Sequence, residues 1–227
     1  MRKKVTMRQK VFPSVMAKSQ QELDAMLKNL SGAAKYLHLD IADGKFVPNT
    51  SLWFSFSLSK KFAKKFKYTA HLMVKDPEKW IQKYEKYAEK KQGKKIEFYI
   101  VPVETISLAE YVKKTKSQKK KVAFALNPET RVAKIKPFLK YIDYVLILAV
   151  HPGFYGAEYL KYPLKKISQI KRSNPKIKVI VDGGMNPTTA KDAAKAGADY
   201  VVSGSFITKA EKPKERMKLM EKGLQGQ

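Results

Sequence analysis

The chain has 227 residues, 44% of them hydrophobic, and carries 47 Lys and Arg against 20 Asp and Glu, a net charge of +27. There is ample apolar material for a core, which excludes a disordered chain, and no run approaches the roughly 18 uninterrupted apolar residues of a membrane span. The absence of cysteine excludes disulfides and thiolate metal sites. The positive charge attracts anions of every kind, from sugar phosphates to nucleic acids, without selecting one.

Short β-branched runs alternate along the chain with longer stretches of helical periodicity. The runs begin near Val11 (VFPSV), Tyr36 (YLHLD), Tyr68 (YTAHLMV), Ile96 (IEFYIV), Val122 (VAFAL), Tyr144 (YVLILAV), Ile177 (IKVIVD) and Asp199 (DYVVSG). Helical spacing of apolar residues predicts helices over 20–30, 77–87, 108–116, 131–139, 160–172, 188–196 and 213–222. Eight such βα units in one chain of this length predict an α/β fold, a single-domain (β/α)8 TIM barrel.

The domain organisation follows from what interrupts this alternation. No Gly/Ser linker divides residues 1–227, so one barrel domain is expected, with residues 1–10 as a short basic N-terminal arm. No apolar signal segment follows this arm, so a cytoplasmic location is expected. An open doubly wound sheet is the alternative architecture, but the turn after the first strand, Pro13 to Met16, lacks the glycine pattern of that fold. Asp76-Pro77 and Asn186-Pro187 predict helix starts.

Polar side chains occupy the ends of three predicted strands. His38 and Asp40 are two apart on a strand, so both side chains leave on the same face. Taken alone they are as well explained by a structural hydrogen bond, and Asp182 before Gly-Gly by a turn cap. His71 at the end of the third strand changes this balance, because catalytic groups of such barrels collect at the carboxyl ends of strands.

Two imidazoles and two carboxylates at one end of a barrel suit a divalent zinc, iron, manganese or cobalt ion. Asp40 and Asp182 belong to the second and seventh strands, so they can face a substrate from different sides. This placement fits inversion at a carbon next to a carbonyl, which needs a base on one face and an acid on the other.

Glycines follow the last three predicted strands: Gly153 and Gly156, Gly183 and Gly184, and Gly204 before Ser205. Each one alone is typical of an ordinary turn. Because backbone amides of the loops after strands seven and eight often bind phosphate in these barrels, the set together favours a phosphorylated substrate.

The chain resembles the ribulose-phosphate 3-epimerase family over nearly its whole length. The segments that carry the resemblance are Pro13-Ser14, LHLDIADGKFVPN (37–49), HLMVKDPEKW (71–80), FALNPET (124–130), HPGFYG (151–156), VDGG (181–184) and AGADYVVSGS (196–205). It implies a (β/α)8 barrel that interconverts D-ribulose 5-phosphate and D-xylulose 5-phosphate in the pentose phosphate pathway, with one divalent metal ion. Members of the family tend to form dimers or hexamers, so a homo-oligomer is open.

The resemblance also implies roles for individual residues. His38, Asp40, His71 and Asp182 would be metal ligands, and Asp40 and Asp182 the catalytic acid/base pair. The substrate would contact Ser14, His71, Gly153, Phe154, Tyr155, Gly156, Asp182, Gly183, Gly184, Gly204 and Ser205, with the glycines and Ser205 chiefly at its phosphate.

The sequence departs from the family pattern at several positions. Ala42 and Leu148 stand where the family usually has methionine, which leaves Met73 of three sulfur-bearing positions. The glycine-rich loop carries Tyr155 and Ala157 in place of glycine and glutamine. Further departures are His151, the missing His-x-Glu around residues 101–104, and 53–56 in place of Phe-Gly-Pro.

Two alternative functions stay open. A 3-epimerase of a hexulose 6-phosphate, such as allulose 6-phosphate, differs only in pocket shape. A non-catalytic barrel that binds polyanions is favoured by the net charge and by lysine clusters at 60–67 and 113–121. Solvated lysine faces explain these clusters more simply, with weak non-specific polyanion binding as an additional property.

Overall fold

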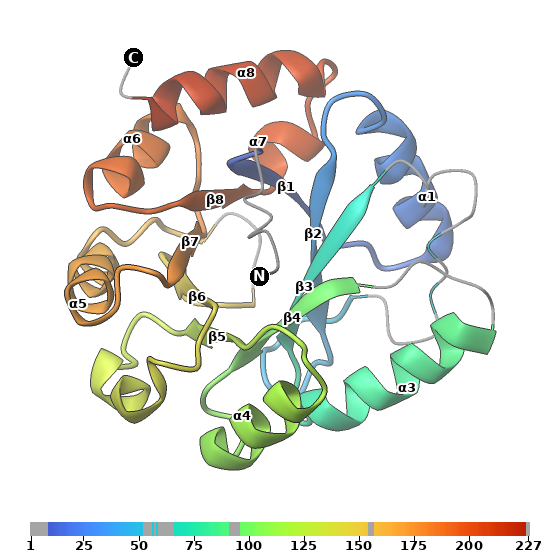
Figure 1. Cartoon of the computed structure of the whole chain (residues 1–227). Helices are drawn as coiled ribbons and strands as arrows, with labels where there is room; N and C mark the ends of the chain where they lie inside the picture. The colour runs from blue at the N-terminus through green and yellow to red at the C-terminus, as the bar shows by residue number, and fades with distance from the viewer. Residues whose placement is uncertain are drawn as a thin grey trace.

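The computed structural model describes residues 9–51, 56, 58, 66–90, 96–153 and 157–225. In this part of the chain, eight parallel strands pair in sequence order, and β8 pairs with β1 to close the barrel (Figure 1). The predicted (β/α)8 barrel is therefore confirmed, and the open doubly wound sheet is wrong, because an open sheet has no pairing between its first and last strands.

The strands are β1 (Val11–Val15), β2 (Tyr36–Ala42), β3 (Lys67–Met73), β4 (Ile96–Pro102), β5 (Ala123–Leu126), β6 (Tyr144–Leu148), β7 (Lys178–Asp182) and β8 (Tyr200–Ser203). The α-helices are α1 (Gln20–Asn29), α3 (Pro77–Lys90), α4 (Leu108–Ser117), α5 (Lys165–Ser173), α6 (Pro187–Lys195), α7 (Ser205–Thr208) and α8 (Pro213–Leu224). The 3-10 helices are η1 (Val132–Lys134), η2 (Lys136–Phe138) and η3 (Tyr162–Leu164). None of the described helices is long and apolar enough to cross a membrane.

The two helices that were predicted to begin with a proline do so, α3 at Pro77 and α6 at Pro187. The Asp76 carboxylate accepts a hydrogen bond from the Lys79 amide at 3.0 Å, ahead of Pro77 in α3. Asn186 and Thr189 form a reciprocal capping box at the start of α6. Both caps satisfy amides that have no partner within the helix.

Two predicted helices are wrong in type or extent. The segment 131–139 forms the 3-10 turns η1 and η2 instead of one α-helix, because Pro137 has no amide hydrogen and its ring clashes with the preceding turn of an α-helix. The helix predicted over 160–172 begins as α5 only at Lys165, after η3, which contains Pro163.

Aromatic side chains fill the amino-terminal end of the barrel interior. Tyr36, Phe98, Tyr144 and Tyr200 come from the four even-numbered strands, as one packing layer of such a barrel requires. The rings of Phe98 and Tyr144 are stacked with centroids 4.3 Å apart, and Phe12 stacks on Tyr200 at 5.3 Å. This end is therefore a packed apolar layer, which leaves the opposite end for polar side chains.

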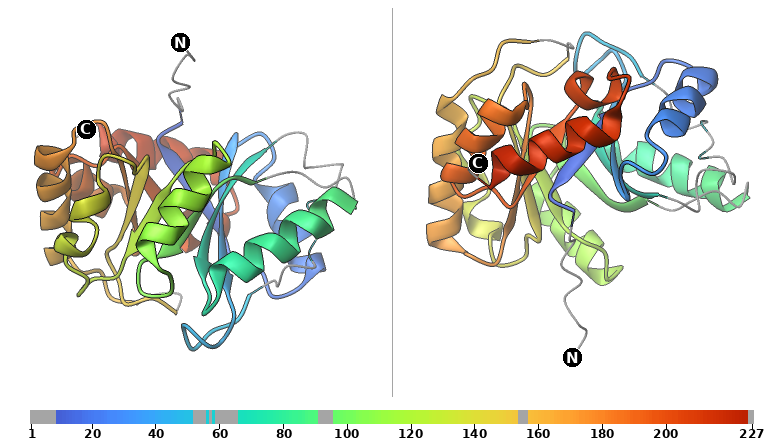
Figure 2. Two further views of the ribbon diagram at one scale, coloured as in Figure 1. Left: turned by 60° about the horizontal axis from the view of Figure 1, so that its bottom comes forward. Right: turned by 90° about the horizontal axis from the view of Figure 1, so that it is seen from above.

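Residues near both ends of the described chain contact the rest of the barrel. Gln9 belongs to it, because its side-chain amide donates to Val11 O at 2.6 Å and to Tyr36 O at 2.8 Å, and accepts from the amides of Lys35 and Tyr36. The expected basic arm is therefore shorter than ten residues, and residues 1–8 of it lie outside the described residues. At the other end of the sequence, α8 packs beside α6 (Figure 2).

Candidate active site

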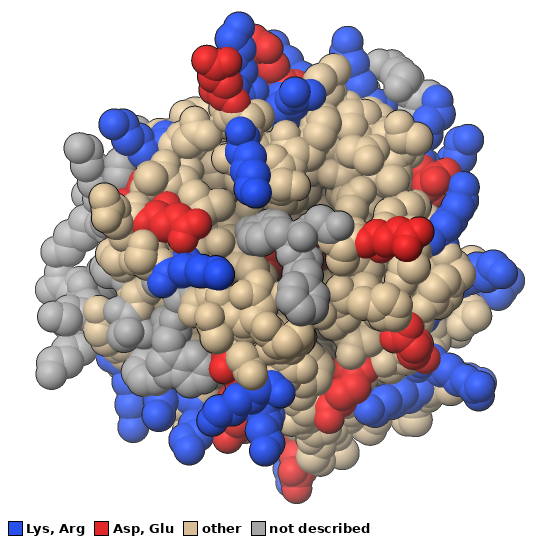
Figure 3. Space-filling view, turned by 180° about the vertical axis from the view of Figure 1, so that it is seen from behind, with Lys and Arg blue, Asp and Glu red and all other residues tan. Residues whose placement is uncertain are grey.

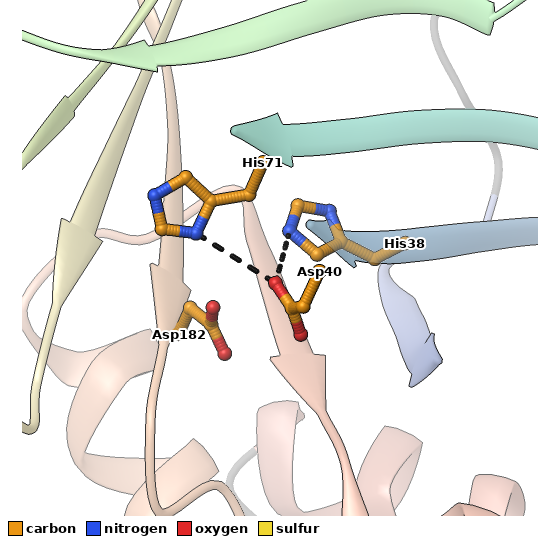
Figure 4. Close-up of side chains that lie close together, drawn as sticks. All are labelled: His38, Asp40, His71 and Asp182. Carbon is orange, nitrogen blue, oxygen red and sulfur yellow. Dashed lines mark ion pairs between the residues drawn. The ribbon is translucent and has the colours of Figure 1, made fainter. Parts of the chain in front are cut away.

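Four side chains converge at the carboxyl ends of the strands. His38 and Asp40 come from β2, His71 from the adjacent β3, and Asp182 from β7 on the other side of the ring (Figure 4). One ligand atom from each lies within 4.8 Å of the others. The structure thus brings together all four residues that the sequence singled out.

Asp40 is the centre of this cluster. Its Oδ1 lies 3.5 Å from His38 Nε2 and 3.7 Å from His71 Nδ1, as the dashed lines in Figure 4 mark. The Ser14 hydroxyl donates to its Oδ2, and the other nitrogen of His38, Nδ1, is 2.9 Å from the Thr69 hydroxyl. Ser14 and Thr69 therefore fix the orientations of Asp40 and His38 from the two neighbouring strands.

Burial and charge push the two carboxyl groups in opposite directions. Burial alone would raise the pKa of Asp40, but the close approach of the His38 and His71 rings and their charges outweigh it and hold that pKa well below its usual range. Burial, reinforced by the charge of Asp40, raises the pKa of Asp182 to about 7. Burial is the larger of these two effects on Asp182, and the neighbouring Asp40 carboxylate adds to it.

The imidazoles also differ. Burial lowers the pKa of both rings, and at His71 this effect prevails. At His38 the close approach of the Asp40 carboxylate and the charges of Asp40 and Asp182 outweigh burial, so its pKa is raised. His71 is thus the ring more readily available in the neutral form that binds metals.

The cluster fits a divalent metal ion. His38 Nε2 and Asp40 Oδ1 are buried without a hydrogen-bond partner, a state that costs about 1–3 kcal/mol for each such atom. In a tetrahedral site with bonds of about 2.0–2.1 Å, ligand atoms lie about 3.4 Å apart, close to the 3.5 and 3.7 Å around Asp40 Oδ1 and longer than a typical N–H···O hydrogen bond. A cation would also offset the charge of Asp40 that disfavours ionisation of Asp182.

A cavity of about 430 Å³ opens above the cluster. Of the residues expected to bind substrate, it is lined by Ser14, Gly153, Asp182, Gly183, Gly184, Gly204 and Ser205, together with Asp40. Figure 3 views this end of the molecule, where Lys and Arg lie mostly toward the periphery. The expected contacts Phe154, Tyr155 and Gly156 lie outside the described residues.

The glycine end of the cavity depends on close approach of two loops. Gly183 has a φ of +104°, and a Cβ added there would lie 2.6 Å from Val150 Cγ2 in the loop after β6. Only glycine meets both requirements without displacing a neighbour. Beside it, α7 begins at Ser205, so its first amides have no helical partner, and Gly204, Ser205 and Phe206 line this end of the cavity.

Two positions that depart from the family pattern differ in their surroundings. Leu148 lines the cavity, whereas Ala42 packs in a small apolar cluster with Met73 and Val47, against which Met16 is packed. Met16 lines the cavity as well, and Asn49 Nδ2 lies 3.8 Å from its sulfur. Sequence reasoning missed Met16, although its position two residues after Ser14 places both side chains on the same face of the chain.

Other polar residues named from the sequence lie outside the cluster. His151 is exposed, and its Nδ1 lies 3.5 Å from Glu129 Oε1. Glu104, where the family pattern departs after β4, accepts a hydrogen bond from the Thr130 hydroxyl. Residues 52–55, including Trp53, lie outside the described part of the chain.

Comparison with known proteins decides the family. Residues 10–208 match the model of the ribulose-phosphate 3-epimerase family. The chain belongs to this family. It is 30% identical to the ribulose-phosphate 3-epimerase of Eremothecium gossypii, over 93% of this chain and 91% of that protein. It is 29% identical to the cytoplasmic isoform from Oryza sativa subsp. japonica, over 96% and 95% respectively.

A solved structure shows the same fold at lower sequence similarity. The 3-hexulose-6-phosphate synthase from Salmonella typhimurium superposes with a TM-score of 0.63 at 14% identity, covering 96% of this chain and 99% of that one. The family inferred from the sequence motifs is confirmed by the relatives, and with it the enzyme class, an isomerase acting on carbohydrates.

Proposed function

We propose that this protein is a metal-dependent epimerase that interconverts D-ribulose 5-phosphate and D-xylulose 5-phosphate by two-base proton transfer at C3. The observation that carries the proposal is the approach of Asp40 and Asp182 from β2 and β7, within one cluster of ligand atoms, in a chain of this family. We also propose a role in the pentose phosphate pathway and a cytoplasmic location, as named for the isoform from Oryza sativa subsp. japonica.

The two carboxyl groups perform the proton transfer. In one direction Asp40 removes the C3 proton from one face while Asp182 delivers a proton to the opposite face, and in the reverse direction the roles exchange. Ser14 donates to the Asp40 oxygen that faces away from the imidazoles, which holds the carboxylate in one orientation. The two acids thus need no movement of the backbone between the half-reactions.

His38, Asp40, His71 and Asp182 would hold the metal. A divalent ion bound there supplies positive charge that offsets the negative charge developing on the substrate oxygens. The substrate phosphate is assigned to the opposite end of the cavity, at the amides around Gly183, Gly184, Gly204 and Ser205. The substrate therefore spans the cavity, with its phosphate at the loops after β7 and β8 and its C3 at the carboxylates.

A coupled assay of ribulose 5-phosphate conversion tests the function, with metal-stripped and metal-reconstituted protein compared. We expect activity that is lost on stripping and restored by one of zinc, iron, manganese or cobalt. A parallel assay with allulose 6-phosphate addresses the alternative of a hexulose 6-phosphate epimerase. Activity only on the hexulose would reassign the substrate, and inactivity on both with full metal occupancy would overturn the proposal.

The acid/base pair is tested by solvent isotope exchange. Asp40→Asn and Asp182→Asn should each abolish epimerisation, and incorporation of solvent deuterium at C3 shows which half-reaction survives. Metal content is measured in both variants because both residues are proposed ligands. A variant that retains its metal and epimerises at the normal rate would remove that residue from the mechanism.

A further inference from the structure

One flank of the barrel carries a strip of exposed cations that form no ion pair among the described residues, with Glu129 as a carboxylate beside it. The segments 130–142 and 159–181 contain no Asp or Glu. Apart from Lys161, which pairs with Asp192 at 3.0 Å, their exposed cations form what we call the basic strip: Arg131, Lys134, Lys136 and Lys140 around η1 and η2, and Lys165, Arg172 and Lys176 in and after α5. In the part of the chain that the structure describes, none of these seven forms an ion pair.

The two segments run side by side. Near the carboxyl end of the barrel, after β5, Lys166 Nζ donates to the carbonyl oxygens of Asn127 and Pro128 at 2.6 and 2.7 Å. Near the amino-terminal end, before β6 and β7, Asn174 Nδ2 donates to Leu139 O at 2.9 Å. Figure 1 shows α5 beside the yellow-green turns of η1 and η2. The cations of the two segments therefore form one continuous surface.

A groove lies along the half of this surface that is nearer the carboxyl end of the barrel. Its volume is about 510 Å³, and Arg131, Tyr162, Lys165 and Gln169 are among its lining residues. Lys165, Gln169 and Arg172 are spaced i, i+4, i+7, so they share one face of α5, and Lys165 and Gln169 place this face toward η1. The carboxylate in the lining is Glu129. Its Oε1 accepts a hydrogen bond from the Tyr162 hydroxyl at 2.9 Å and lies 3.5 Å from His151 Nδ1.

Two exposed tyrosines lie at the ends of the basic strip. Tyr162 is 48% exposed and lies toward the carboxyl end of the barrel, and Tyr141 is 41% exposed and lies toward the amino-terminal end. The third exposed large apolar side chain among the described residues is a leucine on α8. Lys140 Nζ lies 4.9 Å from the centre of the Tyr141 ring. Exposed rings beside unpaired cations are the combination that binds single strands, because bases stack on the rings while phosphates meet the cations.

Other lysine-rich surfaces lack this combination. Between α3 and α4, Lys114 pairs with Glu78 and Lys120 with Glu85. On α8, lysines alternate with glutamates, and Lys212 lies 3.6 Å from Glu215. Among the described residues, the cations of the strip are therefore less compensated by carboxylates than those of these two surfaces.

We propose that the basic strip is a docking surface for single-stranded nucleic acid, bound without sequence preference. Phosphates lie along the cations of η1, η2 and α5, and bases stack on Tyr141 and Tyr162. Helix α5 has 9 residues and spans about 14 Å, so the strip accommodates a few nucleotides at a time. The surface lies on the outer flank of the barrel, separate from the cavity at its carboxyl end, so its occupation does not require displacement of the sugar phosphate.

The first test measures the charge contribution. Fluorescence anisotropy of a labelled oligothymidylate of about 15 nucleotides is followed between about 50 and 200 mM NaCl. A strip variant carries Lys134→Gln, Lys136→Gln, Lys165→Gln and Arg172→Gln, and a control carries Lys212→Gln, Lys214→Gln, Lys218→Gln and Lys222→Gln on α8, which removes the same charge. Thermal unfolding midpoints establish that both variants are folded.

We expect the strip variant to bind at least tenfold more weakly at the middle of the salt range, with a slope of log K against log salt reduced by about 3, since each phosphate contact contributes about 0.7. The control should retain most of the affinity. Equal weakening of the two variants would overturn the proposal, because binding would then reflect the total charge of the protein.

The second test separates single strands from other polyanions. Tyr141→Leu with Tyr162→Leu should weaken oligothymidylate binding about fivefold or more for each ring and leave duplex DNA and heparin binding unchanged. Tyr141→Phe with Tyr162→Phe keeps both rings and should bind as the unaltered protein does. Equal effects of the leucine variant on single strands and duplex, or preferred binding to phosphatidylserine vesicles, would overturn the commitment to single-stranded nucleic acid.

Discussion

At the scale of single residues, the three histidines provide a matched comparison. His38 and His71 are buried beside Asp40, whereas His151 is exposed near Glu129. In the sequence, each of the three lies in or just after a short apolar strand. The strand pattern alone therefore does not distinguish the two buried rings from the exposed one. Burial with Nδ1 3.7 Å from Asp40 Oδ1 is the feature that marks His71 as a proposed ligand.

His71→Ala should lower metal content and epimerase activity together, because a site of four ligands is left with three. The loss of metal affinity should exceed the roughly 10–100-fold that removal of an outer partner of a ligand costs. Elemental analysis after dialysis against a chelator measures it. His151→Ala is the control and should retain full occupancy, and full occupancy in His71→Ala would exclude His71 as a ligand.

The sulfur-bearing positions of the cavity allow a second prediction. Leu148 lines the cavity, so Leu148→Met exchanges similar volumes and adds a polarizable thioether near Met16 and Met73. We expect a higher turnover number on ribulose 5-phosphate with a similar Michaelis constant, as for an interaction made only in the transition state. Unchanged kinetics would show that Leu148 does not contact the reacting centre.

Ala42→Met should behave differently, although the family pattern has methionine at both positions. Ala42 is buried against Met73 and Val47, with Met16 packed on the same cluster, so a longer side chain overpacks this cluster. A cost of about 1–3 kcal/mol in the free energy of unfolding is expected, measured by urea denaturation. Adding Met16→Ala to that variant should recover part of the stability, because it returns the volume that Met16 occupies.

At the scale of elements, two aspartates at the amino-terminal end of the barrel join successive βα units in the same way. Asp143 precedes β6, accepts from the Val122 amide at 3.0 Å and pairs with Lys116 of α4 at 2.8 Å. Asp199 precedes β8, accepts from the Val179 amide at 2.9 Å and pairs with Lys171 of α5. Each carboxylate thus links the start of its own strand to the preceding strand and to the helix that comes before that preceding strand.

Asp199→Asn should destabilise the protein in a pH-dependent manner. Burial would raise the pKa of Asp199, but hydrogen bonds from Lys171, Lys178 and the Val179 amide outweigh it and lower that pKa. Because the pKa is lower in the folded state, its contribution is present above the unfolded value of about 4 and is lost as pH falls through the folded pKa.

Urea denaturation should therefore show a loss of about 1–3 kcal/mol in Asp199→Asn at neutral pH, with a smaller difference below about pH 4. Asp192→Asn removes the pair with Lys161, whose side chain is 72% exposed, and should cost no more than about 1 kcal/mol. A loss in Asp199→Asn that does not depend on pH would show that the ionised carboxylate is not the stabilising form.

At the scale of the whole molecule, the net charge of +27 opposes folding by self-repulsion. The thermal unfolding midpoint should rise as NaCl is increased from about 0.01 to 0.15 M, since the screening length falls from about 30 to 8 Å. Differential scanning calorimetry measures this shift. A midpoint that falls with salt would mean that the surface ion pairs between α3 and α4 and elsewhere contribute more than the repulsion among unpaired cations.

Much of the fold was predictable because its determinants are local. Each strand of the barrel is a short apolar run, and the polar residues at the ends of β2, β3 and β7 interrupt those runs at positions that strand periodicity assigns to one face. The main error, an α-helix over 131–139, arose because apolar spacing does not distinguish an α-helix from consecutive 3-10 turns when Pro137 lies between them.

The sequence by itself determined the barrel, its family and the four chemically distinctive residues, since residue type and spacing along one chain segment are sufficient for each of these. Only the tertiary structure decided how these residues act on one another. Barrel closure and register bring Asp182 of β7 beside Asp40 of β2, and the resulting burial and charge separate the pKa values of the two carboxyls. The same holds for Met16 in the cavity and for the cations along α5 and η1, because distances between segments far apart in sequence depend on how the whole ring of strands closes.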